Sequence, residues 1–248
     1  MLPSPLHLKP DYGVDYPHVV RRFVIVGCSA FFLSFIFWQF ADSWPIGFTR
    51  VVIPLLFFLG MPFFIAGLVM LYGSRHGKLV LRDRLISQLY LQGNEQVLDV
   101  GSGRGLLLIG IASKLTTGRA VGIDLWQSSV QSDNEITTTE ENTRRANVAE
   151  RVELHIGDMR DLPFADGRFD VVVSSWAIHH VSLKDERKQV IEQMWRVLKP
   201  GGKLALIDTS HTTEYEACLK QLGCTTLTKH GPYFTFLRPS YLLQGTKL

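Results

Sequence analysis

The chain has 248 residues, of which 46% are hydrophobic and 20% are charged, enough for one medium-sized domain and an accessory segment. Its formal net charge is only +3, which excludes the large basic face of a nucleic-acid-binding protein. Its three cysteines form no C-x-x-C pair, so the sequence indicates neither a disulfide framework nor a zinc site, and no metal-binding cluster is visible.

Two long uncharged segments near the N-terminus predict a transmembrane hairpin. Phe23–Ala41 and Val51–Gly73 contain no charged residue, and each is long enough to cross a bilayer, which requires roughly 20 apolar residues. The polar stretch Asp42–Arg50 between them suits a tight turn. A signal peptide has a shorter apolar region of about 7–15 residues. A pair of buried helices in a soluble domain remains the alternative.

Basic residues flank the hairpin outside both spans, whereas the turn between the spans holds only Arg50. The flanking residues are Lys9, Arg21, Arg22, Arg75, Lys78, Arg82 and Arg84. Cytoplasmic flanks of membrane helices carry an excess of positive charge. The pattern therefore predicts an integral membrane protein with its N-terminus and its C-terminal domain on the cytoplasmic side.

Residues 74–92 connect the hairpin to the rest of the chain and predict a helix. Leu81, Leu85 and Leu89 recur in this segment at helical spacing. Such a helix either packs on the domain that follows or lies on lipid headgroups, and both interpretations stay open.

The most informative segment is residues 97–105, which read Val-Leu-Asp-Val-Gly-Ser-Gly-Arg-Gly. An apolar strand with an acid near its end runs into a glycine-rich turn, and residues 106–115 predict a helix. This order is typical of the ligand-binding turn of an open α/β sheet. The glycine spacing is G-x-G-x-G, and Leu106 stands where a dinucleotide fingerprint has its third glycine. That difference disfavours NAD or FAD as the ligand.

Further strands and helices alternate along the rest of the chain. Strands are predicted at 119–125, 152–156, 169–174 and 203–208, and helices at 140–148 and 185–198. Alternation of this kind indicates a doubly wound parallel sheet. Two short strands, Cys224–Lys229 and Tyr233–Leu237, flank Gly231–Pro232 and are expected to close the sheet as an antiparallel hairpin.

Four blocks in this order resemble the class I S-adenosylmethionine (SAM)-dependent methyltransferases over about residues 75–248. The blocks are Val97–Gly105, Gly122–Asp124, Gly157–Met159 with Leu162–Phe164, and Leu198–Gly202. The resemblance implies a Rossmann-like, doubly wound, mostly parallel seven-stranded α/β sheet, with SAM as cofactor and S-adenosyl-L-homocysteine as product. The expected domains are the hairpin at 1–73, the connecting helix at 74–92 and the methyltransferase domain at 93–248.

The resemblance also assigns residues to the cofactor. It implies that Asp99 approaches the methionine amino group, that Asp158 accepts from the adenine amino group, and that Met159 offers its backbone N–H to the adenine ring. Asp124 ends its strand where a carboxylate can accept hydrogen bonds from both ribose hydroxyls. The full expected set is Asp99, Gly101, Ser102, Gly103, Gly105, Asp124, Leu125, Asp158, Met159 and Ser174.

Methyl transfer from SAM is a direct displacement, so the enzyme mainly has to align the acceptor. A hydroxyl acceptor would also benefit from a base, and His179 and His180 after the fourth strand are the candidates. A structural histidine bonded to backbone is the alternative. Trp176 and Tyr233 either line an apolar acceptor pocket or belong to the core.

The leading hypothesis is a membrane-anchored SAM-dependent methyltransferase with a lipophilic acceptor: a lipid, a quinone precursor, an isoprenoid or a fatty amine. A second hypothesis gives the enzyme a small soluble acceptor, such as a thiol, a metalloid or a halide, and uses the hairpin only for localisation. A third is a SAM-binding membrane scaffold without catalysis, and an NAD-linked oxidoreductase is a distant fourth. The expected partners are the bilayer and the acceptor, and not nucleic acid.

Overall fold

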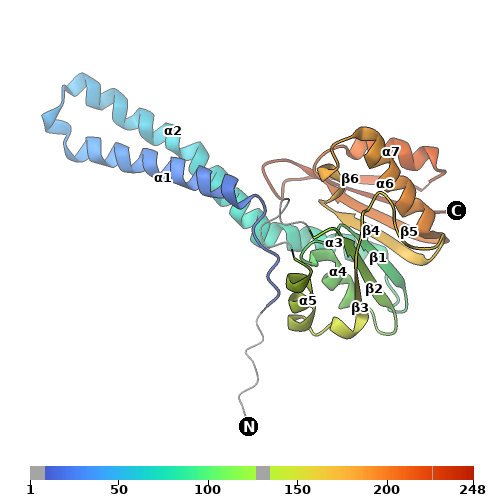
Figure 1. Cartoon of the computed structure of the whole chain (residues 1–248). Coiled ribbons are helices and arrows are strands. Elements are labelled where there is room, and N and C mark those ends of the chain that lie inside the picture. Colours follow the sequence, from blue (N-terminus) through green and yellow to red (C-terminus); the bar gives the residue numbers. More distant parts are fainter. Residues whose placement is uncertain (1–8, 127–134, 225) are drawn as a thin grey trace, which may run out of the picture. The chain divides into compact units, whose positions relative to one another are not determined.

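The computed structural model describes residues 9–126, 135–224 and 226–248 (Figure 1). The chain divides into two compact units. One unit is Val14–Lys78 with Thr235–Leu237, and it contains the apolar hairpin. The other comprises Leu79–Phe234 and Arg238–Leu248, together with residues 9–13. This second unit begins earlier than the boundary at residue 93 that the sequence suggested.

Two long helices, α1 (Pro17–Gln39) and α2 (Ile46–Tyr72), make the hairpin and run side by side in opposite directions (Figure 1). A short 3₁₀ turn, Ala41–Ser43, follows the first helix. The buried hydroxyl of Ser34 donates a hydrogen bond to the carbonyl of Ile53 at 2.9 Å, which joins the two helices inside the apolar region.

Glycines let the two helices approach closely. A Cβ added to Gly27 would lie 2.7 Å from the Cβ of Phe64, and one added to Gly60 would lie 2.7 Å from the Cβ of Ala30. Packing through small residues is the usual basis of helix association in membranes, where lipid and side chains are equally apolar.

The outer surface of the hairpin is apolar. Both helices are long and apolar enough to cross a membrane, and few side chains of their apolar stretches are buried within the structure. The core helix of a soluble protein would instead be mostly buried. The exposed large hydrophobic side chains include Phe32, Phe35, Trp38, Leu55, Phe58 and Leu59. The two helices predicted for this region are therefore present, with their apolar side chains facing outward.

Helix α3 (Lys78–Leu89) follows a π-helical turn, Gly73–Gly77. Leu81, Leu85 and Leu89 are buried in the core of the second unit. The helical spacing of these leucines thus reflects packing on the domain, which was the first of the two interpretations. Lipid headgroups are not needed to explain that face.

The second unit is built on a seven-stranded sheet in the order β3-β2-β1-β4-β5-β7-β6. Its strands are β1 (Gln96–Val100), β2 (Arg119–Asp124), β3 (Val152–Ile156), β4 (Phe169–Ser175), β5 (Leu198–Asp208), β6 (Thr228–Tyr233) and β7 (Ser240–Thr246). The first five are parallel neighbours, β7 runs antiparallel to β5, and β6 runs antiparallel to β7. The predicted doubly wound, mostly parallel seven-stranded sheet is confirmed.

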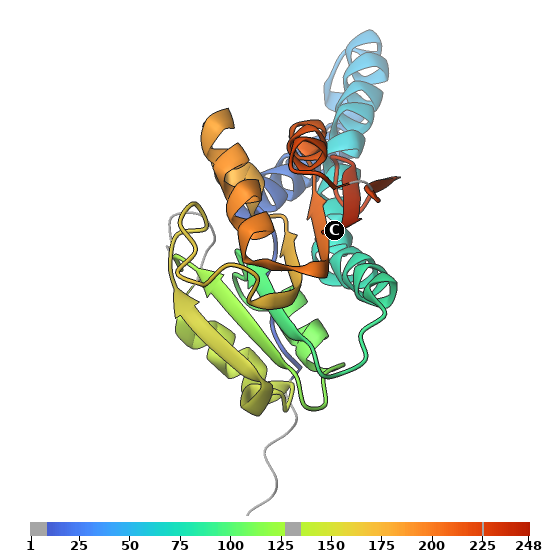
Figure 2. The same ribbon diagram turned by 90° about the vertical axis from the view of Figure 1, so that its right-hand side faces the viewer.

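Alternation along the strands creates a hydrophobic core on each face of the sheet. Besides α3, the helices of this unit are α4 (Leu106–Ala112), α5 (Ile136–Arg145), α6 (Lys184–Val197) and α7 (Thr212–Gln221). Leu98 and Val100 pack with side chains of α6 and α7. Val97 packs with side chains of α3 and α4 on the opposite face. Figure 2 shows the helices on both sides of the sheet.

The C-terminal region differs from its sequence-based prediction. The closing hairpin is antiparallel as expected, but its strands are β6 and β7. The predicted strands were 224–229 and 233–237, and residue 225 lies outside the described residues. Gly231–Pro232 lies inside β6, at an irregularity in its pairing with β7, and not in the turn. Proline lacks an amide hydrogen, so it marks irregular edge strands as readily as turns. Helix α7 was not predicted.

The close packing at Gly60 can be tested directly. Gly60→Leu forces a larger side chain against Ala30, so we expect the hairpin in detergent to lose about 1–3 kcal/mol of stability. The matched control is Gly47→Leu in the same helix, where an added Cβ meets nothing within 4 Å. Unfolding in SDS, followed by far-UV circular dichroism, measures both variants. Equal stability of the two would contradict this account of the packing.

Candidate active site

The carboxyl ends of the parallel strands meet at one edge of the sheet, and polar side chains stand there. Asp99, Asp124, Ser174 and Asp208 lie at or near the ends of β1, β2, β4 and β5. Asp158 follows the end of β3. Ligands of open α/β sheets bind outside this edge, at the point where the strand order reverses. Here that point lies between β1 and β4.

The loop after β1 has a backbone conformation that glycine adopts most easily. Gly101 has a φ of +74°, and a Cβ at this position would overlap the Cβ of Ala177. Gly105 has a φ of +82° at the start of α4. The Gly101 amide donates to the carbonyl of Ile123 at 2.8 Å, which ties the loop to β2. The missing side chains let a ligand come close to the loop backbone.

Asp124 holds the glycine loop from the neighbouring strand. Its Oδ2 accepts from the Gly103 amide at 2.9 Å, and its Oδ1 accepts from the Trp126 amide at 2.8 Å. A carboxylate oxygen can accept more than one hydrogen bond, so both oxygens can still receive ribose hydroxyls. Leu125, which lies between Asp124 and Trp126 in the sequence, is exposed.

Asp99 and Ser102 present buried polar atoms that lack a partner. Both carboxylate oxygens of Asp99 and the Oγ of Ser102 have no hydrogen bond to any residue that the structure describes. Burial raises the pKa of Asp99 to about 7, and the charge of Asp124 adds to the rise. Folded proteins rarely leave such groups unpaired. This carboxyl group is therefore suited to receive a cationic amino group.

Asp158 is bound by an arginine that sequence reasoning missed. Its Oδ2 accepts from Nη2 of Arg160 at 2.6 Å, and its Oδ1 accepts from the Arg160 amide at 2.8 Å. The side-chain hydrogen bond from Arg160 is the main cause that lowers the pKa of the Asp158 carboxyl. Arg160 also donates to Glu186 at 2.9 Å. An adenine amino group at Asp158 would thus share the carboxylate with Arg160. Met159, between them, packs against the core.

Three further side chains near this edge have structural partners. The Oγ of Ser174 is buried and donates to the last carbonyl of β1 at 2.7 Å. The indole of Trp176 donates to Oγ of Ser240 at 3.1 Å, and the guanidinium of Arg84 lies 5.0 Å from the ring centroid of Tyr233. Trp176 and Tyr233 both pack against the core on the α3 side, in line with the second of their two interpretations.

His179 forms a pair with a buried aspartate. Its Nδ1 lies 2.6 Å from Oδ1 of Asp208, which is 2% exposed, and its backbone amide donates to Oδ2 at 3.2 Å. The hydroxyl of Tyr215 donates to the same Oδ2 at 3.2 Å. A carboxylate at Nδ1 favours the tautomer in which Nε2 carries the lone pair. Sequence reasoning missed Asp208, whose only signal was its place at the end of a predicted strand.

His180 has a different environment from its neighbour. Its ring centroid lies 4.1 Å from that of His179, although the residue as a whole is exposed. Partial burial of the ring and then the neighbouring His179 lower the pKa of His180, so its imidazole is neutral at pH 7. The carboxylate of Asp208 is hydrogen-bonded to His179.

The raised pKa of Asp99 makes a prediction for stability. Between about pH 4 and pH 7 the unfolded chain loses this proton while the folded chain keeps it, so folding becomes less favourable as the pH rises. Asp99→Asn carries no charge and should raise Tm at pH 8 by roughly 8–16 °C, because a rise in pKa from about 4 to about 7 is worth about 4 kcal/mol and each 1 kcal/mol moves Tm by about 2–4 °C in a domain of this size. Calorimetry at pH 4 is the internal control, where we expect no gain. An equal gain in Tm at both pH values would contradict the raised pKa of Asp99.

Comparison with known proteins agrees with this geometry. Residues 98–206 match the family model of a methyltransferase domain. The chain is 35% identical over 128 residues to 27-O-demethylrifamycin SV methyltransferase of Amycolatopsis mediterranei, which covers 52% of this chain and 43% of that protein. It is 29% identical over 133 residues to demethylmenaquinone methyltransferase of Lactobacillus johnsonii, which covers 53% of this chain and 51% of that protein. The chain thus spans about half the length of the curated relatives it matches.

A solved structure has the same fold. The SAM-dependent methyltransferase from Aquifex aeolicus superposes with a TM-score of 0.55 at 19% identity, covering 69% of this chain and 92% of that chain. At this identity the likeness concerns the fold alone, so the site has to be argued from its own residues.

Those residues fit the cofactor of this family. SAM, when bound, supplies an electrophilic methyl group on a sulfonium. Asp99 is suited to hold its amino group, and Asp124 is suited to its ribose hydroxyls. The observation that supports this assignment is that the oxygens of Asp99 and Ser102 have no hydrogen-bond partner among the described residues. The matched methyltransferase domain at residues 98–206, the seven-stranded sheet and the glycine loop with its two acids give this part of the chain the fold and the cofactor loop of a class I SAM-dependent methyltransferase domain.

Proposed function

We propose that this protein is a membrane-anchored methyltransferase that transfers the methyl group of SAM to a hydroxyl of a lipophilic acceptor. The observation that carries the proposal is the joining, in one chain, of a methyltransferase domain and a hairpin long and apolar enough to cross a bilayer. An acceptor that partitions into the bilayer is concentrated where such an enzyme is held. Lipids, quinone precursors and isoprenoids with a hydroxyl belong to this class.

The hairpin also suggests an orientation. Basic residues lie outside both spans, so we place the N-terminus and the methyltransferase domain on the cytoplasmic side. Protease digestion of tags at both chain ends, in sealed vesicles of known orientation, tests this placement. Protection of one tag but not the other would contradict it.

The pair of His179 and Asp208 supports an acceptor that loses a proton. Methylation of a neutral hydroxyl leaves one proton to be removed, and a positioned base contributes about 10²–10⁴-fold to such a reaction. Because Nδ1 of His179 bonds to Asp208, its Nε2 is the basic nitrogen, and the carboxylate stabilises the imidazolium that forms. We assign His179 as the proton acceptor, and Asp208 with Tyr215 as the residues that orient it. His180 is the second candidate for the base.

Two of the curated relatives support an organic acceptor. One is named for 27-O-demethylrifamycin SV, which indicates an oxygen as its methylation site, and another is named for demethylmenaquinone. Neither relative decides the acceptor of this chain, because each match covers about half of the relative's length.

Transfer of labelled methyl groups tests the proposed acceptor class. The full chain in nanodiscs is incubated with labelled SAM and either a total lipid extract or a mixture of thiols, arsenite and halides. We expect label in the lipid fraction. Label mainly on the small soluble compounds would make the lipophilic acceptor wrong. SAM binding by calorimetry without transfer to either mixture would favour a non-catalytic scaffold.

Substitution of the histidine pair tests the chemistry. His179→Ala should lower kcat by about 10²–10⁴-fold while leaving the Kd of SAM within about threefold. Asp208→Asn should lower kcat by at least about tenfold through the wrong tautomer. His230→Asn, on the exposed strand β6, is the matched control and should retain full activity. If His180→Asn carries the loss and His179→Ala does not, the base is His180.

A further inference from the structure

The N-terminal strap, which we define as Lys9–Gly13, belongs to the methyltransferase unit and not to the hairpin that follows it in the chain. Tyr12 packs against the core on the α3 side, and the guanidinium of Arg82 lies 6.0 Å from the centroid of its ring. The strap is thus docked on the domain through a side chain that the core accommodates.

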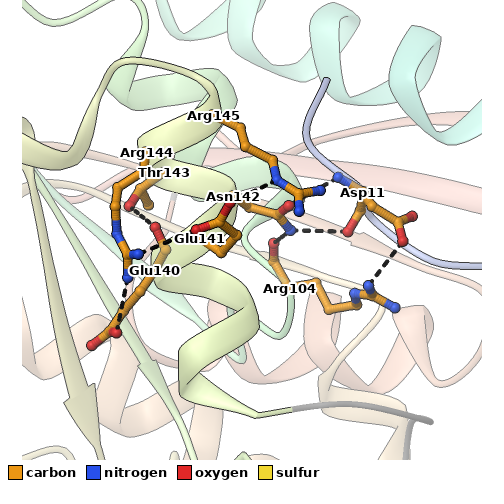
Figure 3. Close-up of polar contacts among 8 residues, drawn as sticks. All are labelled: Asp11, Arg104, Glu140, Glu141, Asn142, Thr143, Arg144 and Arg145. Carbon is orange, nitrogen blue, oxygen red and sulfur yellow. Dashed lines mark hydrogen bonds and ion pairs between the residues drawn. The ribbon is translucent and has the colours of Figure 1, made fainter. Parts of the chain in front are cut away.

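Asn142 on α5 binds the strap and the glycine loop at the same time (Figure 3). Its Oδ1 accepts from the Asp11 amide at 2.9 Å. Its Nδ2 donates to the Asp11 carbonyl at 2.9 Å and to the Arg104 carbonyl at 3.0 Å. Asn142 is 1% exposed. A buried amide that bonds three backbone groups fixes their positions relative to one another.

The same face of α5 holds the neighbouring carbonyl of the loop. Thr139 donates its hydroxyl to the carbonyl of Gly103 at 2.6 Å, and the indole of Trp126 donates to that carbonyl at 3.0 Å. Residues three apart on a helix share a face, so Thr139 and Asn142 act side by side. Helix α5 therefore fixes two consecutive carbonyls of the segment that the cofactor approaches.

The side chain of Asp11 adds a contact to the only charged residue of the loop. Its Oδ2 accepts from Nη2 of Arg104 at 3.1 Å, and its Oδ1 accepts from the Gly13 amide at 2.9 Å. A Cβ on Gly13 would lie 2.7 Å from Nη1 of Arg104. The Asp11 side chain is 66% exposed, so its ion pair is weak and sensitive to salt. The bonds of buried Asn142 are not screened in this way.

We propose that Asp11, Asn142 and Arg104 form a clasp that holds the glycine loop in its SAM-binding conformation. Asp11 and Asn142 are then positioning residues for the cofactor. This inference goes beyond the proposed function, because it concerns SAM and does not depend on the acceptor. A loop whose carbonyls are already fixed loses less conformational freedom on binding, and this preorganisation is expressed as affinity. Opening the clasp raises the Kd and KM of SAM and leaves the chemical step unchanged.

Calorimetric titration of the full chain in detergent with SAM tests the clasp. Asn142→Asp places a carboxylate oxygen opposite the carbonyls of Asp11 and Arg104, and we expect the Kd of SAM to rise about tenfold or more. Asp11→Ala should raise it about two- to fivefold at low ionic strength, and this effect should vanish in about 0.5 M salt. The matched control is Arg144→Ala, whose partners Glu140 and Glu141 lie on the same helix and whose side chain is exposed. It should bind SAM like the wild type.

A merely structural role would lower the Tm of the ligand-free protein and leave the Kd of the folded fraction unchanged. Asp11→Pro removes the amide hydrogen whose bond Asn142 accepts, and it leaves α5 unchanged. This variant replaces Asn142→Asp in the titration if Asn142→Asp does not fold. A Kd within about twofold of the wild type in either folded variant overturns the proposal. If the loss of SAM affinity in Asp11→Ala is independent of salt, the role assigned to the ion pair of Asp11 with Arg104 is overturned.

Discussion

Five neighbouring strands run parallel, and this single constraint assembles the candidate active site. Parallel strands end at the same edge, so Asp99, Asp124 and Asp208 arrive together although they are far apart in the chain. Gathering acids in a poorly solvated place is unfavourable unless each finds donors. Asp124 accepts hydrogen bonds from the amides of Gly103 and Trp126, and Asp208 is hydrogen-bonded to His179 and Tyr215. Asp99 alone among these three lacks a partner among the described residues.

The glycine loop shows how such an edge obtains a defined shape. Glycines allow the close approach of a ligand, but they also make the free loop flexible. Helix α5 compensates from one side, through Thr139 and Asn142. Its opposite face carries exposed ion pairs such as that of Arg144 with Glu140. One face of this short helix thus supports the glycine loop, and the other face is exposed to solvent.

Much of this arrangement could be predicted from the sequence, because it follows from local patterns. Apolar runs marked the buried parallel strands, and the glycine spacing with Asp99 and Asp124 marked the cofactor loop. The rest depends on pairings between distant residues. Asp208 meets His179 across 29 positions, and Asn142 meets Asp11 across 131. Asn142 lies in the helix predicted at 140–148 and Thr139 lies just before it, and no local pattern indicated that either side chain contacts the glycine loop. Strand β6 is almost entirely exposed and lacks the alternation that reveals a strand.

The separation between Asp11 and Asn142 has a consequence for how the chain is made. The strap leaves the ribosome first, and its partner on α5 follows 131 residues later. Both helices of the hairpin and the strands β1 and β2 are synthesised in that interval. Closing so long a loop is entropically unfavourable until the intervening segments are compact. The strap therefore cannot dock on α5 until the hairpin and the strands β1 and β2 have been synthesised.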